Sequence, residues 1–150
     1  MDSFRLIENF GERLGMTLER NPDGAYLFEI DGRHFSIHDI AECRQIVLSG
    51  DLGHPPPGCR EKLCVALLEA QHMLKGTAGA TFSIDPETGK FTLCKALVPA
   101  VLDSDAFFRE SEIFIDTLQS WAGIIGNFRT DAPPDNDGPH RFLQSGFMSV

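Results

Sequence analysis

The chain has 150 residues, of which 42 % are apolar and 23 % are charged, and twelve are phenylalanine. A chain of this size can bury the core of one compact domain, and its composition excludes disordered and fibrous proteins. Thirteen Lys and Arg stand against 22 Asp and Glu, so the formal charge of -9 makes nucleic acid and acidic membrane surfaces unfavourable partners.

The sequence carries no recognisable targeting segment. Residues 1–5 lack the basic start of a secretory signal, and no stretch approaches the roughly 18 apolar residues that span a bilayer. The cysteines are too few and too irregularly spaced for a disulfide scaffold. They are Cys43, Cys59, Cys64 and Cys94. We therefore expect a cytoplasmic protein in which the cysteines are small apolar side chains.

Residues 2–15 have the pattern of an amphipathic helix that ends at Gly15. Four apolar residues recur at spacings of three and four along one face. They are Phe4, Ile7, Phe10 and Leu14. Glu8, Glu12 and Arg13 lie away from this stripe, which indicates a solvent-facing side.

A period of two follows and predicts three antiparallel strands. Residues 16–19, 25–30 and 33–38 alternate apolar with other side chains, and turn sequences rich in Asn, Asp and Gly separate them. In the second strand, Leu27 lies on the face opposite the other large apolar residues. Residues 44–48 fit either a further strand or an irregular connection, and we leave both open.

The middle of the chain carries a surplus of apolar residues. Residues 50–58 contain three consecutive prolines and predict a loop, because proline donates no backbone hydrogen bond. A helix is expected from Cys59 to Lys75, closed by Gly76. Its apolar residues cover about 220° around the axis, whereas a helix on one core needs only about 100°. Such a helix needs two partners, which favours a protein interface.

The remaining elements indicate an α+β fold. Residues 80–84 and 91–94 alternate around a turn at Asp85–Gly89 and predict a hairpin. Residues 103–105 supply N-cap candidates for a long last helix that ends near Gly126. Runs of strands joined by hairpins predict an antiparallel sheet covered on one face by helices. The predicted order is one helix, three strands, the undecided strand, one helix, two strands and one helix.

The C-terminal part departs from this pattern. We expect a single domain over residues 1–128, followed over residues 129–150 by a linker rich in Pro, Asp and Gly with an apolar end. Four large apolar residues lie in that end: Phe142, Leu143, Phe147 and Met148. Either the end has no fixed structure, or it folds back over an unfilled apolar patch.

No local motif indicates catalysis or metal binding. His34 and His38 are four residues apart, which separates them by about 13 Å along a strand, so one ion cannot bind both. Ser36 between them suits hydrogen bonds on a strand face as well as catalysis, and neither a P-loop nor a GxSxG motif is present. We expect no enzyme, no metal and no cofactor, although a site built from distant residues leaves no local signature.

Several features occur together between residues 3 and 127. They are the helix end Leu14–Gly15, the turns Asp23–Gly24 and Asp31–Gly32, the run Leu63–Gln71, the hairpin Phe82–Leu93 and Trp121 in the last helix. Together they resemble the type III secretion chaperones of the Tir-chaperone (CesT-like) family, in which asparagine often stands where this chain has Gln71.

The resemblance implies a cytoplasmic homodimer without catalytic activity. Such a dimer binds the N-terminal region of a secreted effector, keeps it partly unfolded and secretion-competent, and helps to deliver it to the export apparatus, whose ATPase is a further candidate partner. Neither nucleic acid nor membrane insertion is expected. The alternative is a small dimeric adaptor or regulatory protein of similar fold that binds a folded partner.

The resemblance also implies two sets of site residues. The effector-binding residues are Phe4, Leu6, Leu18, Leu27 and Phe28. The dimer-interface residues are Leu63, Leu67, Leu68, Leu74 and Phe82.

Overall fold

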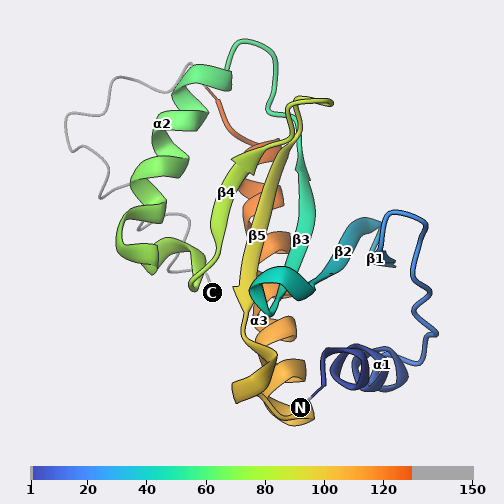
Figure 1. Cartoon of the computed structure of the whole chain (residues 1–150). Coiled ribbons are helices and arrows are strands. Elements are labelled where there is room, and N and C mark those ends of the chain that lie inside the picture. Colours follow the sequence, from blue (N-terminus) through green and yellow to red (C-terminus); the bar gives the residue numbers. More distant parts are fainter. Residues whose placement is uncertain (1, 130–150) are drawn as a thin grey trace. The chain divides into compact units, whose positions relative to one another are not determined.

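The structure is a computed structural model that describes residues 2–129. Residues 130–150 of the predicted linker, with the apolar residues Phe142, Leu143, Phe147 and Met148, lie outside this range. The elements are α1 (Ser3–Arg13), β1 (Ala25–Ile30), β2 (Arg33–Ile40), η1 (Ala41–Cys43), β3 (Gln45–Gly53), α2 (Arg60–Gln71), η2 (His72–Thr77), β4 (Thr81–Ile84), β5 (Phe91–Leu97), η3 (Pro99–Val101) and α3 (Ser104–Gly126) (Figure 1).

The strands form one sheet in the order β1-β2-β3-β5-β4, so β1 and β4 are its edge strands. β1 pairs antiparallel with β2, and Phe28 stands opposite Phe35. β2 pairs antiparallel with β3, and Ile37 stands opposite Leu48. The predicted α+β fold with an antiparallel sheet is confirmed.

The described residues group into two compact units. Unit 1 contains residues 2–50 and 94–115, and unit 2 contains residues 51–93 and 116–129. Each unit contains part of β3, of β5 and of α3.

An aromatic cluster joins the helices of unit 1 to its strands. The rings of Phe28 and Phe35 are stacked with centroids 5.4 Å apart. Phe10 of α1 meets Phe28 at 5.6 Å and Phe107 of α3 at 5.9 Å. Such ring pairs contribute about 0.5–1.5 kcal/mol each beyond the burial of their area. α1 and the first half of α3 therefore cover the same face of the sheet.

The buried face of α1 differs from the predicted stripe. Its buried residues are Leu6, Ile7, Phe10 and Gly11. Phe4, which was expected on the stripe, is 56 % exposed. A Cβ at Gly11 would lie 2.9 Å from the carbonyl oxygen of Met16, so only glycine lets the following chain return so closely along α1.

The predicted strand at residues 16–19 is wrong. The backbone N–H of Met16 donates to the carbonyl oxygen of Gly11 at 2.9 Å, which turns the segment toward α1. The chain meets β1 only at an isolated bridge between Arg20 and Tyr26. The alternation of this segment reflects packing against a helix on one side rather than strand pairing.

The undecided segment at residues 44–48 belongs to β3, which extends to Gly53 into the predicted loop. The residues on its buried face are Ile46, Leu48, Gly50 and Leu52. Gly50 occupies one of these buried positions, so the alternation of buried and half-buried residues continues through it. The sequence predicted a loop at this point.

α2 ends at Gln71 and not at the predicted Lys75. Met73 and Leu74 adopt left-handed backbone conformations with φ of 59°, which stop the helix. The chain then turns back so far that a Cβ at Gly76 would overlap the carbonyl oxygen of Ala70. The indole Nε1 of Trp121 donates to the carbonyl oxygen of Gly76 at 2.9 Å and holds this turn in place.

The predicted hairpin and the predicted last helix are both confirmed. In the turn of the hairpin, the Asp85 carboxylate accepts the backbone N–H of Glu87 at 2.9 Å, and this hydrogen bond lowers the pKa of Asp85. At the start of α3, the side chain of Asp103 accepts the backbone N–H of Ala106 at 2.8 Å and caps the helix.

Candidate binding surfaces

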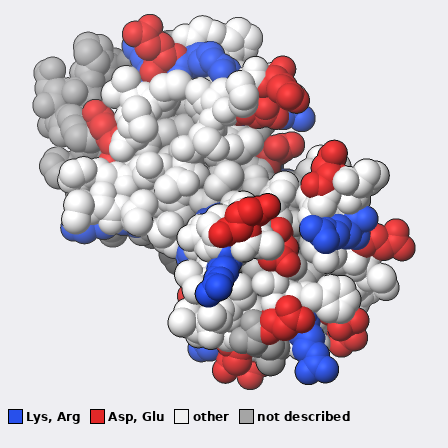
Figure 2. All heavy atoms as spheres, viewed as in Figure 1, with Lys and Arg blue, Asp and Glu red and all other residues white. Residues whose placement is uncertain are grey.

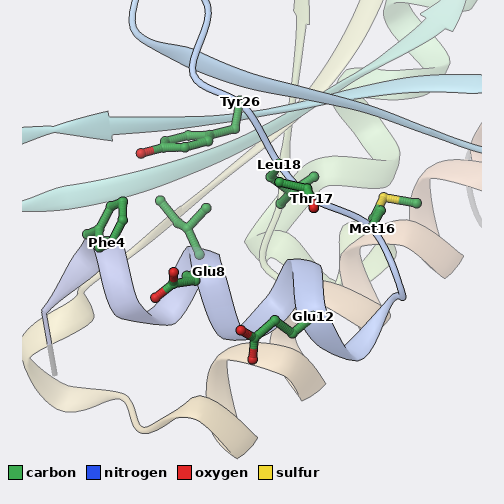
Figure 3. Close-up of a pocket in the computed structure, with 8 residues that line it drawn as sticks. Phe4, Glu8, Glu12, Met16, Thr17, Leu18 and Tyr26 are labelled. Carbon is green, nitrogen blue, oxygen red and sulfur yellow. The ribbon is translucent and has the colours of Figure 1, made fainter.

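A cavity of about 240 Å³ lies between α1, the segment that follows it, and β1 (Figure 3). We call it the α1 pocket, and its lining residues are Phe4, Ile7, Glu8, Glu12, Met16, Thr17, Leu18 and Tyr26. Ile7 and Tyr26 are buried, whereas Phe4 is exposed at the start of α1. The cavity is smaller than the roughly 300–1,000 Å³ of small-molecule sites, so it suits side chains of a polypeptide better than a cofactor.

Two carboxylates lie on the α1 side of this pocket. Glu8 and Glu12 are four residues apart, which places them on one face of the helix, and both are exposed (Figure 3). Among the described residues, neither forms an ion pair. Arg13 of the same helix pairs with Asp105 at 3.0 Å instead. The rim of the α1 pocket therefore carries negative charge that the described residues leave uncompensated.

The edge of β1 continues this surface in unit 1. Beyond the bridge between Arg20 and Tyr26, no described strand pairs with the outer side of β1. Leu27 on this strand is 58 % exposed and Phe28 is half-buried. An open edge with an exposed apolar side chain can accept the main chain of another polypeptide.

Unit 2 has an apolar groove of about 220 Å³ between α2 and β4. We call it the α2–β4 groove, and its lining residues are Cys64, Leu67, Leu68, Phe82, Ser83, Ile84 and Phe91. Leu68 is 66 % exposed, and Val65, one turn earlier on α2, is 53 % exposed. Figure 2 shows a wide uncharged area over α2 and β4. An apolar surface of this kind is typical of a protein interface.

Gln71 and Trp121 fix the geometry of this groove. The side-chain oxygen of Gln71 accepts the backbone N–H of Phe82 at 2.6 Å, which ties the end of α2 to β4. The ring of Phe82 also meets Trp121 of α3 edge to face, with centroids 5.1 Å apart. The wall of the groove is therefore held from two sides.

The structure places the predicted effector-binding residues in three environments. Phe4 and Leu18 line the α1 pocket, and Leu27 and Phe28 lie on β1. Leu6 is completely buried in the core of unit 1 and presents no surface. Six residues of the pocket were not predicted from the sequence: Ile7, Glu8, Glu12, Met16, Thr17 and Tyr26.

The predicted dimer-interface residues divide in a similar way. Leu67, Leu68 and Phe82 line the α2–β4 groove, and Leu74 is 44 % exposed in η2. Leu63 is completely buried one helix turn before Leu67, which is on the same face of α2. Val65 and Ile84 are exposed residues that were not predicted for this interface, and Val65 lies outside the apolar arc predicted for the helix.

The residues considered for catalysis form a simple hydrogen-bonded pair. Ser36 Oγ lies 2.9 Å from His38 Nε2, and His34 Nδ1 lies 3.8 Å from a carboxylate oxygen of Glu29. In the part of the chain that the structure describes, no group of three His, Cys, Asp or Glu residues is arranged to hold a metal ion. No helix within residues 2–129 is long and apolar enough to cross a membrane.

Residues 5–122 match the sequence profile of the Tir chaperone protein (CesT) family. The Chlamydia pneumoniae protein CPj0713/CpB0740 is 27 % identical over 132 residues, which cover 81 % of this chain and 95 % of that protein. A chain of the solved ExsC–ExsE complex has a TM-score of 0.67 and 20 % identity, covering 83 % of this chain and 94 % of its own. A chain of the HopA1–SchA chaperone–effector complex has a TM-score of 0.64 and 17 % identity, covering 80 % and 92 %. These solved structures share the fold.

Proposed function

The chain belongs to the Tir chaperone protein (CesT) family, and we propose that it is a cytoplasmic type III secretion chaperone without catalytic activity. It binds the N-terminal region of a secreted effector and keeps that region partly unfolded and competent for secretion. The ATPase of the export apparatus is a candidate further partner.

The observation that supports this proposal most directly is the α1 pocket beside the open edge of β1. A strand edge binds main-chain groups, which every polypeptide has, and a pocket next to it selects side chains. The two together suit an extended client segment rather than a folded domain. The exposed side chains Phe4 and Leu27 supply apolar contacts for such a segment.

We further propose that the protein is a homodimer through the α2–β4 groove. Leu68 and Val65 are exposed within their own chain, and a second copy would remove them from water. Leu63 is already enclosed and takes no part in this interface, whereas Leu67 contributes from the base of the groove.

Co-expression with each protein encoded beside the gene of this chain tests the chaperone function. We expect a stable complex in which the N-terminal region of one such protein gains hydrogen-exchange protection while it remains sensitive to protease, because it is bound in an extended form. Phe4→Asp should weaken this complex, since it places a charge against the apolar pocket. Val101→Asp is the matched control, because Val101 is 80 % exposed and lines neither surface.

Two results would contradict the proposal. A bound partner that is compact and protease-resistant favours the adaptor or regulatory alternative. Equal loss of binding in Phe4→Asp and Val101→Asp shows that the α1 pocket is not the contact.

A further inference from the structure

The α1 pocket combines an apolar interior with two carboxylates on one side. Ile7 and Tyr26 form buried apolar walls, and Glu8 and Glu12 lie on the exposed helix face that borders the cavity (Figure 3). An apolar pocket alone selects for size, whereas charges fixed at its rim also select for the charge of the residues that flank the occupant.

The described residues do not neutralise these carboxylates. α1 contains two cations, of which Arg13 pairs with Asp105 at 3.0 Å and lies over the ring of Phe108 at 4.2 Å. The other, Arg5, forms no ion pair with Glu8 or Glu12 among the described residues. The chain as a whole has a formal charge of -9, which adds a long-range preference for cationic partners.

The spacing of the carboxylates matches an extended polypeptide. Four residues of helix rise by about 6 Å, and two residues of an extended chain span about 6.6 Å. An extended segment that runs along α1 can therefore place one cation near Glu8 and a second near Glu12 when the two cations are two residues apart.

We propose that the α1 pocket selects client segments in which a large apolar side chain lies about two residues from a pair of Lys or Arg that are themselves two residues apart. The apolar side chain fills the cavity, and the flanking cations pair with Glu8 and Glu12. This inference rests on the proposed chaperone function and specifies the chemistry of the segment that the chaperone accepts.

Four fluorescein-labelled peptides of equal length test the inference by fluorescence anisotropy with the full chain. The first has the core Phe-Ser-Lys-Ser-Lys in a Gly-Ser host. The second replaces both Lys by Glu, the third replaces both Lys by Gln, and the fourth replaces Phe by Ala. We expect the first to bind at least about tenfold more tightly than the second, a difference of about 1.4 kcal/mol that two exposed ion pairs can supply.

The double variant Glu8→Gln with Glu12→Gln should reduce the ratio between the first and second peptides to below about threefold, because it removes both carboxylates without a large change in shape. Glu42→Gln with Glu112→Gln is the matched control. It changes the net charge by the same amount, but at two exposed carboxylates outside the pocket. The ratio of the affinities for the first and second peptides should therefore stay higher than in the Glu8→Gln, Glu12→Gln variant. High salt should lower the ratio in the unmodified chain.

Several results would overturn the inference. One is equal affinity for the Lys, Gln and Glu peptides, and a second is an equal change in both double variants. A third is the absence of measurable binding of the Lys–Phe peptide by a chain that still forms its client complex. In each case, a client complex that Phe4→Asp weakens would still support the proposed chaperone function. The inference about charge can therefore be rejected while the chaperone function is retained.

Discussion

The side-chain amide of Gln71 joins the end of α2 to the edge strand β4. Its oxygen accepts the backbone N–H of Phe82 at 2.6 Å, and Phe82 in turn forms one wall of the α2–β4 groove. Asparagine, which the family often has at this position, is one methylene shorter. The longer side chain of this protein reaches a backbone group, and the position of β4 relative to α2 depends on it.

We predict that Gln71→Ala lowers the free energy of unfolding by about 1–3 kcal/mol, because the N–H of Phe82 loses its acceptor. Urea denaturation followed by tryptophan fluorescence measures this, since Trp121 lies against Phe82. Gln71→Glu keeps an acceptor oxygen at the same distance along the side chain and should lose less stability. An equally stable Gln71→Ala variant would show that the hydrogen bond contributes nothing.

The turn after α2 depends on a glycine for steric reasons. A Cβ at Gly76 would overlap the carbonyl oxygen of Ala70, and the carbonyl of Gly76 is the acceptor for Trp121. The two preceding left-handed residues, Met73 and Leu74, bring the chain back to this position. The turn therefore connects α2 to α3 through the carbonyl group of Gly76, at a position that leaves no space for a side chain.

We predict that Gly76→Ala destabilises unit 2 by about 1–3 kcal/mol, the usual cost of overpacking. Gly123→Ala is the matched control, because Gly123 is exposed in α3 with no atom near its would-be Cβ. That change should raise stability by up to about 1 kcal/mol, since alanine favours helix over glycine. Thermal unfolding of both variants measures the contrast, and a shift in the same direction for both would contradict it.

Local patterns were sufficient to predict the elements whose partners are close in sequence. The hairpin of β4 and β5 and the capped start of α3 carry turn and cap residues beside them. β3 was not predicted in full, because Gly50 occupies a buried strand position and gives no apolar signal. The segment 16–19 alternates as a strand does, but its hydrogen bond to Gly11 depends on a close approach that periodicity does not encode.

The binding surfaces were predictable only in part for a related reason. Periodicity identifies residues that share a helix face, but it does not say which face meets the core when apolar residues occupy both. The family resemblance assigned Leu6 and Leu63 to surfaces, and periodicity could not correct this although both are buried; Val65 was left out although it is exposed. Glu8 and Glu12 were correctly expected on the solvent side, and only the position of Tyr26 on β1 makes that side a pocket wall.

The α1 pocket and the α2–β4 groove, both formed by residues within 2–129, differ in composition. The α1 pocket in unit 1 has carboxylates on its rim, whereas the α2–β4 groove in unit 2 is lined by apolar residues and one serine and one cysteine. An apolar lining suits a permanent contact with a second copy, and a charged rim suits a selective contact with a client.

We predict a mass in solution near twice 16.6 kDa. Val65→Asp with Leu68→Asp should reduce it to that of one chain, because the two charges would be buried in the dimer contact yet remain in water in the monomer. Light scattering measures the mass, and circular dichroism checks that the variant is folded. Leu27→Asp, on an exposed position of β1, is the control and should leave the mass unchanged. A folded double variant of undiminished mass would place the interface elsewhere.

The close contact at Gly11 limits the width of the α1 pocket. Any larger residue there would push against the carbonyl of Met16 and the side chain of Leu18, which both belong to pocket-lining residues. The width of the cavity therefore depends on Gly11, which is buried and does not line the cavity. A Gly11→Ala exchange would therefore change the width of the cavity without changing any side chain that lines it, because the added methyl group meets the carbonyl oxygen of Met16 and the side chain of Leu18.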